Sequence, residues 1–215
     1  MLRIHFVLIG EGSSDAGLIP HLEKLCIEAG ADEVSGTSPD FQRINESVGS
    51  DIEAKIRATL ALEPSANLIF IHRDADSRNP EPRYSEIVLA VQSSGYTSSY
   101  VAVVPVQETE SWLLLDEREI RQVAQKPNGR RRLYLPRPRG VERVANAKEK
   151  LQDTLVVACE LSGRRLDRFK RNFPVYRKLL LQRLPIGGPL NQVRSWVRLR
   201  RDLERALQAL RDSSI

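Results

Sequence analysis

The sequence is poor in the residues that build metal sites from sulfur and nitrogen, and it lacks long apolar runs. It contains two cysteines, three histidines and no CxxC pair. Cys26 and Cys159 lie in apolar, helix-like segments, so we expect buried reduced thiols and neither a disulfide nor a zinc site. No apolar run reaches the roughly 18 residues of a membrane-spanning helix. The opening MLRIHFVLIGEGSSD turns acidic quickly and is more typical of a first strand than of a cleavable signal. We therefore expect a soluble, cytoplasmic protein with no membrane association.

Charge is distributed very unevenly along the chain. Residues 1–120 contain nine Lys and Arg against 20 Asp and Glu, a net charge of −11, whereas residues 121–215 contain 24 against eight, a net charge of +16. An acidic half is suited to holding cations, and a basic half to contacting phosphates. We expect two domains with these bounds and a polyanion, such as nucleic acid, as partner of the second. Simple solvation of arginine-rich helices is the alternative explanation.

Short apolar segments alternate with helical patterns in the acidic half. This alternation predicts βαβ units, hence an α/β fold with a Rossmann-like parallel sheet flanked by helices. The basic half is expected to be all-helical after a Pro-, Gly- and Arg-rich linker or exposed loop at 126–140. The expected strands are 3–9, 67–72 and 100–106, with a weak edge strand in the loop-like segment 31–48. The expected helices are 18–29, 50–62, 83–94, 107–116, 142–160, 164–182 and 189–211.

Carboxylates follow each of the three strong strands. They are Glu11, Asp74 with Asp76, and Glu108 with Glu110. Because the carboxyl ends of parallel strands meet at one edge of a sheet, we expect these side chains to converge. Such a cluster stays ionised only if cations offset its charge. Hard oxygen ligands without a His or Cys set favour one or two Mg²⁺ or Mn²⁺ ions.

The spacing of individual acids refines this metal hypothesis. In extended backbone, Asp74 and Asp76 would point the same way and could reach one ion. Glu11 lies between two glycines in a strand-to-helix turn, where it could ligate metal or handle a proton. Asp15 is either a further ligand or a first-turn carboxylate that complements the helix dipole.

Three ordered motifs carry a resemblance to a known family. GEGSSD after the first strand and DAD after the second resemble the Toprim domain of topoisomerases, bacterial primases, recombination-repair proteins and overcoming-lysogenisation-defect (OLD) nucleases. The stretch VPVQETESWLLLD resembles a signature of small stand-alone Toprim-like proteins, which are often encoded near ATPases in bacterial defence loci. The resemblance covers roughly residues 1–118, with a fainter likeness around PVYRKLLLQRL and the final helix.

The resemblance implies a Toprim-like fold and a role for each acid. Glu11 would be a metal ligand or acid–base group, and Asp74 and Asp76 would be Mg²⁺ ligands. Glu108 and Glu110 would be candidates for a second ion, as in OLD-like nucleases. The assignment among Glu108, Glu110 and Asp116 is ambiguous, and Asp116 could be a ligand or a supporting residue. If Glu110 points into the core beside Trp112, the site would hold one ion.

The basic residues are candidates for contacts with nucleic acid. Arg73 and Arg78 could grip a scissile phosphate or form salt bridges with the acidic cluster, and the sequence leaves both open. The other candidates are Arg130, Arg131 and Arg132, with Arg137 and Arg139, in an exposed loop, and Lys170, Arg171, Arg177 and Lys178 in a helical stripe. His72, Trp112 and Trp196 are expected in the core or at its rim rather than in catalysis.

These observations predict a Mg²⁺-dependent Toprim-like nuclease that hydrolyses DNA or RNA, in a bacterial anti-phage defence system. The alternative is a non-catalytic Toprim-like module that binds nucleic acid or a partner within a complex containing an ABC- or AAA-type ATPase. A Rossmann-like nucleotide-binding protein is disfavoured, because GEGSSD is not GxGxxG and an acidic edge repels phosphates. The sequence leaves the choice of DNA or RNA and the oligomeric state open.

Overall fold

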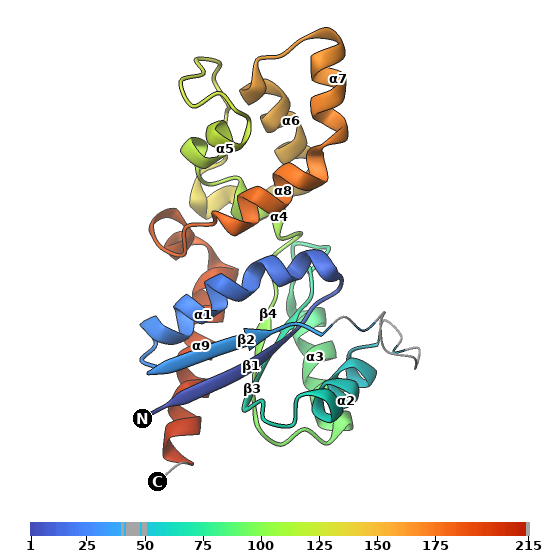
Figure 1. The fold of residues 1–215 in the computed structure, drawn as a ribbon, viewed down its shortest axis with the longest axis vertical. Coiled ribbons are helices and arrows are strands. Elements are labelled where there is room, and N and C mark those ends of the chain that lie inside the picture. Colours follow the sequence, from blue (N-terminus) through green and yellow to red (C-terminus); the bar gives the residue numbers. More distant parts are fainter. Residues whose placement is uncertain (40, 42–47, 49–50, 214–215) are drawn as a thin grey trace. The chain divides into compact units, whose positions relative to one another are not determined.

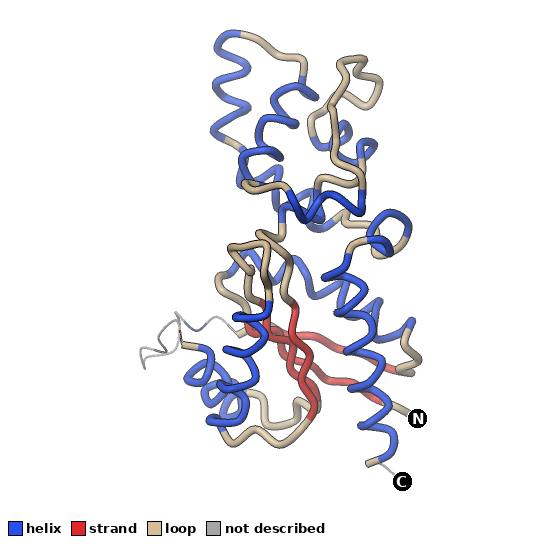
Figure 2. The backbone as a smooth tube through the Cα atoms, turned by 180° about the vertical axis from the view of Figure 1, so that it is seen from behind, coloured by secondary structure: helices blue, strands red, loops and turns tan. Residues whose placement is uncertain are grey.

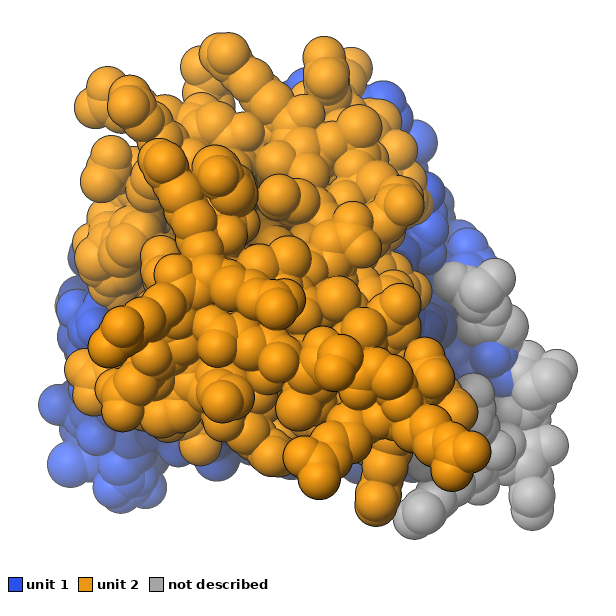
Figure 3. All heavy atoms as spheres, turned by 90° about the horizontal axis from the view of Figure 1, so that it is seen from above, with its two compact units in different colours: residues 1–73, 80–104, 198–215 blue, residues 74–79, 105–197 orange. Residues whose placement is uncertain are grey.

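The computed structural model describes residues 1–39, 41, 48 and 51–213. It has an α/β fold with a parallel sheet flanked by helices, as expected. The chain divides into two compact units, coloured separately in Figure 3. Unit 1 comprises Met1–Arg73, Pro80–Val104 and Arg198–Ile215, and unit 2 comprises Asp74–Asn79 and Pro105–Val197. The expected functional domains, 1–120 and 121–215, stay a prediction.

Unit 1 contains a four-stranded parallel sheet in the order β2-β1-β3-β4 (Figure 1). Its strands are β1 (Arg3–Ile9), β2 (Glu33–Thr37), β3 (Leu68–His72) and β4 (Ser99–Val103). The central strands β1 and β3 are nearly all apolar, since both of their faces are covered. Phe6 and Phe70 meet between them edge to face, with ring centroids 4.9 Å apart.

Helices cover both faces of this sheet. Figure 1 shows α1 (Ile19–Glu28) with the C-terminal α9 (Arg194–Asp212) on one face, and α2 (Ile52–Leu62) with α3 (Glu81–Ser94) on the other. The connection from β1 to β2 therefore runs on the opposite face from the connection between β2 and β3. Reversal of the winding direction makes the carboxyl ends of β1 and β3 the topological switch point, where ligands bind in open α/β sheets.

Unit 2 is helical (Figure 2), and all regular elements of the described residues 121–213 are helices, as expected for the basic half. Its α-helices are α4 (Glu110–Leu113), α5 (Glu117–Val123), α6 (Ala147–Cys159), α7 (Gly163–Arg171) and α8 (Phe173–Gln182). Two 3₁₀ helices, η3 (Pro138–Arg143) and η4 (Gly188–Gln192), complete it; a third, η1 (Ser13–Leu18), belongs to unit 1. The core holds Trp112 and Trp196 edge to face at 5.0 Å, with Trp112 Nε1 donating to Ser195 Oγ at 3.0 Å. Both tryptophans are core residues, as predicted.

Several elements differ in extent from the sequence expectation. The single helix expected at 164–182 is two helices, because Pro174 lacks an N–H and begins a new helix in its first turn. The helix expected at 107–116 is reduced to Glu110–Leu113, and Asp116 caps the following helix. The last helix starts at Arg194 rather than 189, after the Pro189-containing η4. The weak edge strand expected within 31–48 is β2, although part of that segment lies outside the described residues.

Two further expectations concern single residues and the membrane. Cys26 and Cys159 are each fully buried and neither forms a disulfide, as predicted. Burial, with the charge of Glu23, raises the pKa of Cys26 to about 12, so this thiol stays protonated. Among the described helices, none is long and apolar enough to cross a membrane.

Candidate functional site

The turn after β1 is built around the carboxylate of Asp15. Oδ2 of Asp15 accepts hydrogen bonds from the backbone N–H of Glu11 at 2.8 Å and of Gly12 at 3.3 Å. Gly10 permits this close approach, because a Cβ on Gly10 would lie 2.8 Å from the same oxygen. Asp15 therefore fixes the backbone from which the Glu11 side chain projects.

Asp15 has a second buried partner in His72, the last residue of β3. Nδ1 of His72 lies 3.0 Å from Oδ2 of Asp15. Burial alone raises the pKa of Asp15, but the hydrogen bond and charge of His72, with the amides of the turn, lower it to about 2. The Asp15 carboxylate is thus ionised and surrounded by donors. This geometry corresponds to the supporting role that the sequence left open beside a metal-ligand role.

Glu11 is paired with Arg73, which directly follows β3. Nε of Arg73 lies 3.1 Å from Oε1 of Glu11, and its Nη2 lies 3.5 Å from Oε1 of Glu86. The Glu11 side chain keeps 35% of its surface exposed, whereas Arg73 keeps 18%. The sequence left open whether Arg73 contacts a phosphate or pairs with the acidic cluster, and in the structure it forms a salt bridge with Glu11. The pair lies at the switch point between β1 and β3.

A buried lysine that the sequence analysis missed completes this end of unit 1. Lys55 of α2 donates from Nζ to the carbonyl oxygen of Gly10 at 2.8 Å, and only 8% of its surface is exposed. Burial lowers its pKa, and the positive charge of Arg73 lowers it further. The carboxylates of Glu11 and Asp15 act in the opposite direction. A signal existed, since Lys55 follows Ile52 by three residues and therefore lies on the same face of its helix.

In unit 2, Asp74 is held by Thr109. Oδ1 of Asp74 accepts hydrogen bonds from the backbone N–H of Thr109 at 2.9 Å and from its Oγ1 at 2.8 Å. Thr109 is 1% exposed, so this hydroxyl is committed to orienting the carboxylate. Thr109 was also missed; its position inside the QETES motif was the available signal.

Asp76 departs from the geometry assumed in the sequence analysis. Its φ is 52°, in the left-handed region, so the backbone is not extended through the Asp-x-Asp pair. Asp76 N donates to Gln107 O at 2.8 Å, and Gln107, itself at φ 64°, donates from N to Ser77 O at 3.1 Å. The extended backbone that was expected to point Asp74 and Asp76 the same way is therefore wrong. Each non-glycine residue in this conformation costs roughly 1–3 kcal/mol and is more often found at functional sites.

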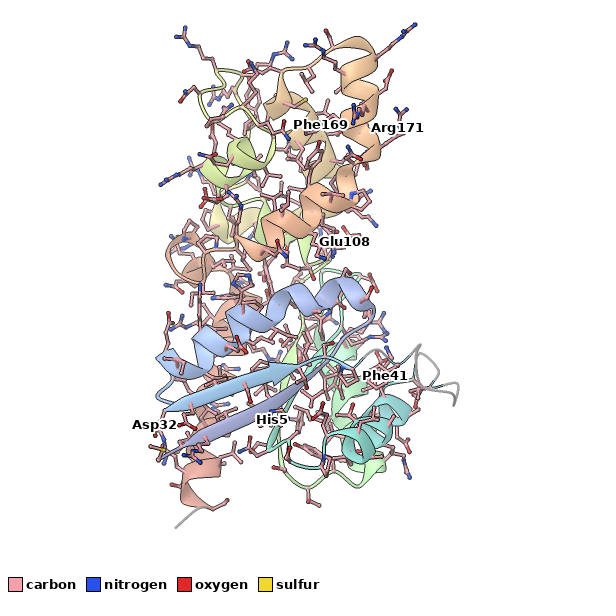
Figure 4. The ribbon with its side chains drawn as sticks, in the orientation of Figure 1. His5, Asp32, Phe41, Glu108, Phe169 and Arg171 are labelled. Atoms are coloured by element: carbon pink, nitrogen blue, oxygen red, sulfur yellow. The ribbon has the colours of Figure 1, made fainter. Side chains whose placement is uncertain are left out.

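The other predicted acids have structural partners. Oε2 of Glu108, labelled in Figure 4, accepts from the backbone N–H of Lys148 at the start of α6 at 2.8 Å. Glu110 is 3% exposed, and Arg177 lies with Nε 2.5 Å from its Oε1. Asp116 caps α5 by accepting from Glu119 N at 3.1 Å. The positive charge of Arg177 therefore balances the negative charge of the buried Glu110.

The basic candidates are mostly on the surface. Arg73 and Arg177 differ from the others because they are partly buried in ion pairs with Glu11 and Glu110. Arg171, at the end of α7, is labelled in Figure 4. The exposed candidates are Arg78, Arg130, Arg131, Arg132, Arg137, Arg139, Lys170, Arg171 and Lys178.

The carboxylates of Glu11, Asp74 and Asp76 are oxygen donors of the kind that bind hard, hydrated cations. Within the described part of the chain, no three His, Cys, Asp or Glu side chains form a ready-made metal cluster. In unit 1 Glu11 is exposed, and in unit 2 Asp76 is exposed and Asp74 is half-buried. Mg²⁺ keeps several waters and commonly binds through one or two carboxylates, so carboxylates of this kind fit Mg²⁺ better than a closed zinc site.

A cavity elsewhere in unit 1 provides a comparison. It has a volume of about 460 Å³ and is lined by edge-strand β4, by Tyr84 of α3 and by Arg198 of α9. None of the predicted carboxylates lines it, and Arg198 stacks over the Tyr84 ring at 3.3 Å from the centroid. The presence of a cavity therefore does not by itself identify the candidate site.

Comparison of the sequence with protein-family models gave no match, and comparisons with the curated proteins and with the solved structures gave none either. The Toprim resemblance therefore rests on the three sequence motifs and stays a prediction.

Proposed function

We propose that the protein is a Mg²⁺-dependent phosphodiesterase that hydrolyses DNA or RNA. The observation that supports this most is the position of Glu11 at the switch point between β1 and β3, with Asp74 the second residue after β3. Acids directly after neighbouring parallel strands are a reason to look for a metal site there, and the basic residues exposed on unit 2 supply contacts for phosphates.

Each residue has a proposed task. Asp74, which Thr109 orients, would be the principal ligand of the ion, and Asp76 and Glu11 stay the further candidates for a ligand or proton carrier that the sequence predicts. When bound, Mg²⁺ polarises a phosphate and lowers the pKa of water. Thr109 orients Asp74, and Asp15 with Lys55 fixes the backbone that carries Glu11. Because Glu110 is paired with Arg177, we favour one ion over two.

The proposal is tested by incubating the purified protein with labelled single- and double-stranded DNA and RNA in Mg²⁺, Mn²⁺ or EDTA. We expect cleavage with either ion, none in EDTA, and loss of cleavage in Asp74→Asn. Asp153→Asn, an exposed acid on α6, is the matched control and should retain wild-type cleavage. Mn²⁺ binding, followed by electron paramagnetic resonance, should weaken in Asp74→Asn but not in the control. Cleavage that survives EDTA or Asp74→Asn would refute the metal mechanism.

A second function is supported by the ion pairs at the acids. Glu11 and Glu110 are already matched by Arg73 and Arg177, as in a structural site that needs no metal. The corresponding proposal is a non-catalytic subunit that binds nucleic acid or an ABC- or AAA-type ATPase partner, in the cytoplasm and in anti-phage defence. Nucleic-acid binding without cleavage and without Mn²⁺ binding would favour this function over the nuclease.

A further inference from the structure

The loop after α5 is irregular in conformation but firmly held. In this loop, called the arginine loop below and comprising residues 126–140 (Figure 1), Oε1 of Glu160 accepts from the backbone N–H of Arg130 at 2.8 Å and of Arg131 at 3.1 Å. From the other side, Nη2 of the buried Arg121 donates to the carbonyl oxygen of Arg131 at 2.7 Å. The backbone of Arg130 and Arg131 is therefore fixed by side chains of α5 and of the end of α6.

Two further features accompany this anchoring. A Cβ on Gly129 would lie 2.8 Å from Nη1 of Arg121 and 3.1 Å from Oε1 of Glu160, so a larger residue would displace the two side chains that hold the loop. The hydrogen bonds from the backbone N–H groups of Arg131 and Arg130 lower the pKa of Glu160, because they stabilise its ionised form.

The anchored loop presents an aromatic ring to solvent. Leu133 is 4% exposed, whereas its neighbour Tyr134 is 70% exposed. The guanidinium carbon of Arg132 lies 4.9 Å from the Tyr134 ring centroid, close enough for a cation–π interaction. Tyr134 has φ 49°, which is unfavourable for a bulky residue. The chain thus holds a large ring outside the core at a cost in backbone energy.

The charged residues of the arginine loop itself are all of one sign. The arginine loop contains five Arg and one Lys and no acidic residue. Its exposed guanidinium groups attract phosphates, and an exposed ring beside them offers a flat apolar surface. Bases within a duplex are already stacked on their neighbours, whereas unpaired bases are free to stack on aromatic side chains.

We propose that the arginine loop binds single-stranded nucleic acid, with an unpaired base stacked on Tyr134 and phosphates contacted by Arg130, Arg131 and Arg132. The inference deepens the proposed function by naming its substrate class, and rests on it only in taking nucleic acid as the partner. Binding through this loop does not depend on the metal, so it can be measured in EDTA.

The test is fluorescence anisotropy in EDTA with a labelled oligothymidine and a labelled duplex DNA. Tyr134→Ala should weaken oligothymidine binding by about fivefold to a hundredfold, the range of one lost base–aromatic stack, and leave duplex binding nearly unchanged. Tyr134→Phe keeps the ring and should bind like the wild type. Tyr134→Gly relieves the backbone strain and should show the same loss without destabilising the fold. Failure of the wild type to bind oligothymidine, or equal losses on both probes, would overturn the inference.

Two measurements separate the stack from general electrostatics and from the proposed nuclease. Arg132→Ala should reduce the slope of log affinity against log salt by about 0.7 for a single strand, whereas Tyr134→Ala should leave the slope unchanged. Metal-dependent cleavage with binding insensitive to Tyr134 would overturn this inference and leave the nuclease standing. Binding that depends on Tyr134, without cleavage under any metal, would overturn the proposed nuclease and leave this inference standing.

Discussion

Nδ1 of His72 lies 3.0 Å from Oδ2 of Asp15, and both side chains are buried beneath the turn that carries Glu11. An ionised carboxylate accepts hydrogen bonds but cannot donate, so the proton lies on Nδ1 of His72. The same oxygen accepts from the turn backbone, so one atom ties β3 to the turn after β1. The exposed Glu11 therefore stands on a rigid base.

Asp15 predicts a specific dependence of stability on pH. Its folded pKa of about 2 lies below the ordinary value of 3.8, so its contribution is fully present above pH 3.8 and is lost as pH falls towards 2. The shift corresponds to about 2 kcal/mol in the free energy of unfolding. Asp15→Asn, measured by urea unfolding in EDTA, should be less stable than the wild type by about this amount at pH 7. The difference should shrink between pH 4 and pH 2.

The exposed Asp153 of α6 supplies the control for that titration. Asp153→Asn should follow the wild type at every pH. A difference between Asp15→Asn and the wild type that stays constant down to pH 2 would show that the lost stability comes from packing and not from ionisation.

Thr109 predicts a loss of metal binding without a loss of fold. Thr109→Val keeps the shape and the backbone N–H bond to Asp74 but removes the Oγ1 bond of 2.8 Å. Replacing a residue that orients a metal ligand typically lowers metal affinity or activity by about 10- to 100-fold. We expect a loss of this size in Mn²⁺ affinity and in cleavage. Thr109→Ser restores a hydroxyl and should recover most of both. Equal Mn²⁺ affinity and equal cleavage in Thr109→Val and Thr109→Ser would show that the Thr109 hydroxyl does not support metal binding.

The ion pair between Glu110 and Arg177 predicts a structural role for Glu110, which the family resemblance makes a candidate metal ligand. Removing one partner of a buried ion pair costs about 3–5 kcal/mol, so Glu110→Gln should markedly lower the free energy of unfolding. The double variant Glu110→Gln with Arg177→Met leaves no unpaired buried charge and should recover much of that loss. Mn²⁺ affinity should be unchanged in both. Weakened Mn²⁺ binding with unaltered stability would instead support Glu110 as a ligand.

The sheet could be predicted from the sequence because its evidence is local. Apolar runs covered on both faces, separated by helical patterns, determine a parallel α/β sheet, and β1 and β3 lie where these runs predicted. The sequence also contains a signal for a helix boundary that the expected helix 164–182 ignored. Pro174 divides this helix into two because it cannot donate the hydrogen bond of a helix interior.

The partners of the acids could not be predicted in the same way. Arg177 is 67 residues from Glu110, and His72 is 57 residues from Asp15. Such pairs are set by tertiary packing, which periodicity does not encode. The left-handed conformation of Asp76 also had no local signal, since aspartate adopts both that conformation and an extended one. The motif therefore located the acids along the chain but not the direction of each side chain.

Lys55 gives the last prediction. Its Nζ holds the carbonyl oxygen of Gly10 at 2.8 Å, and its charge lies near the carboxylates of Glu11 and Asp15. Lys55→Met keeps a linear side chain but removes both effects, so the turn should no longer hold Glu11 in place. We expect about tenfold or greater loss of cleavage and of Mn²⁺ affinity. The free energy of unfolding should change by only about 1 kcal/mol, because removing a desolvated cation offsets the lost hydrogen bond.

Lys24 of α1 is exposed and provides the matched lysine. Lys24→Met should leave cleavage, Mn²⁺ affinity and stability at wild-type values. Lys55→Arg preserves the charge but not the fit, so it should fall between Lys55→Met and the wild type. If Lys55→Met unfolds the protein while Lys55→Arg is fully active, the lysine contributes charge balance to the fold; if Lys55→Met is folded and fully active, neither the hydrogen bond to Gly10 nor the charge positions Glu11.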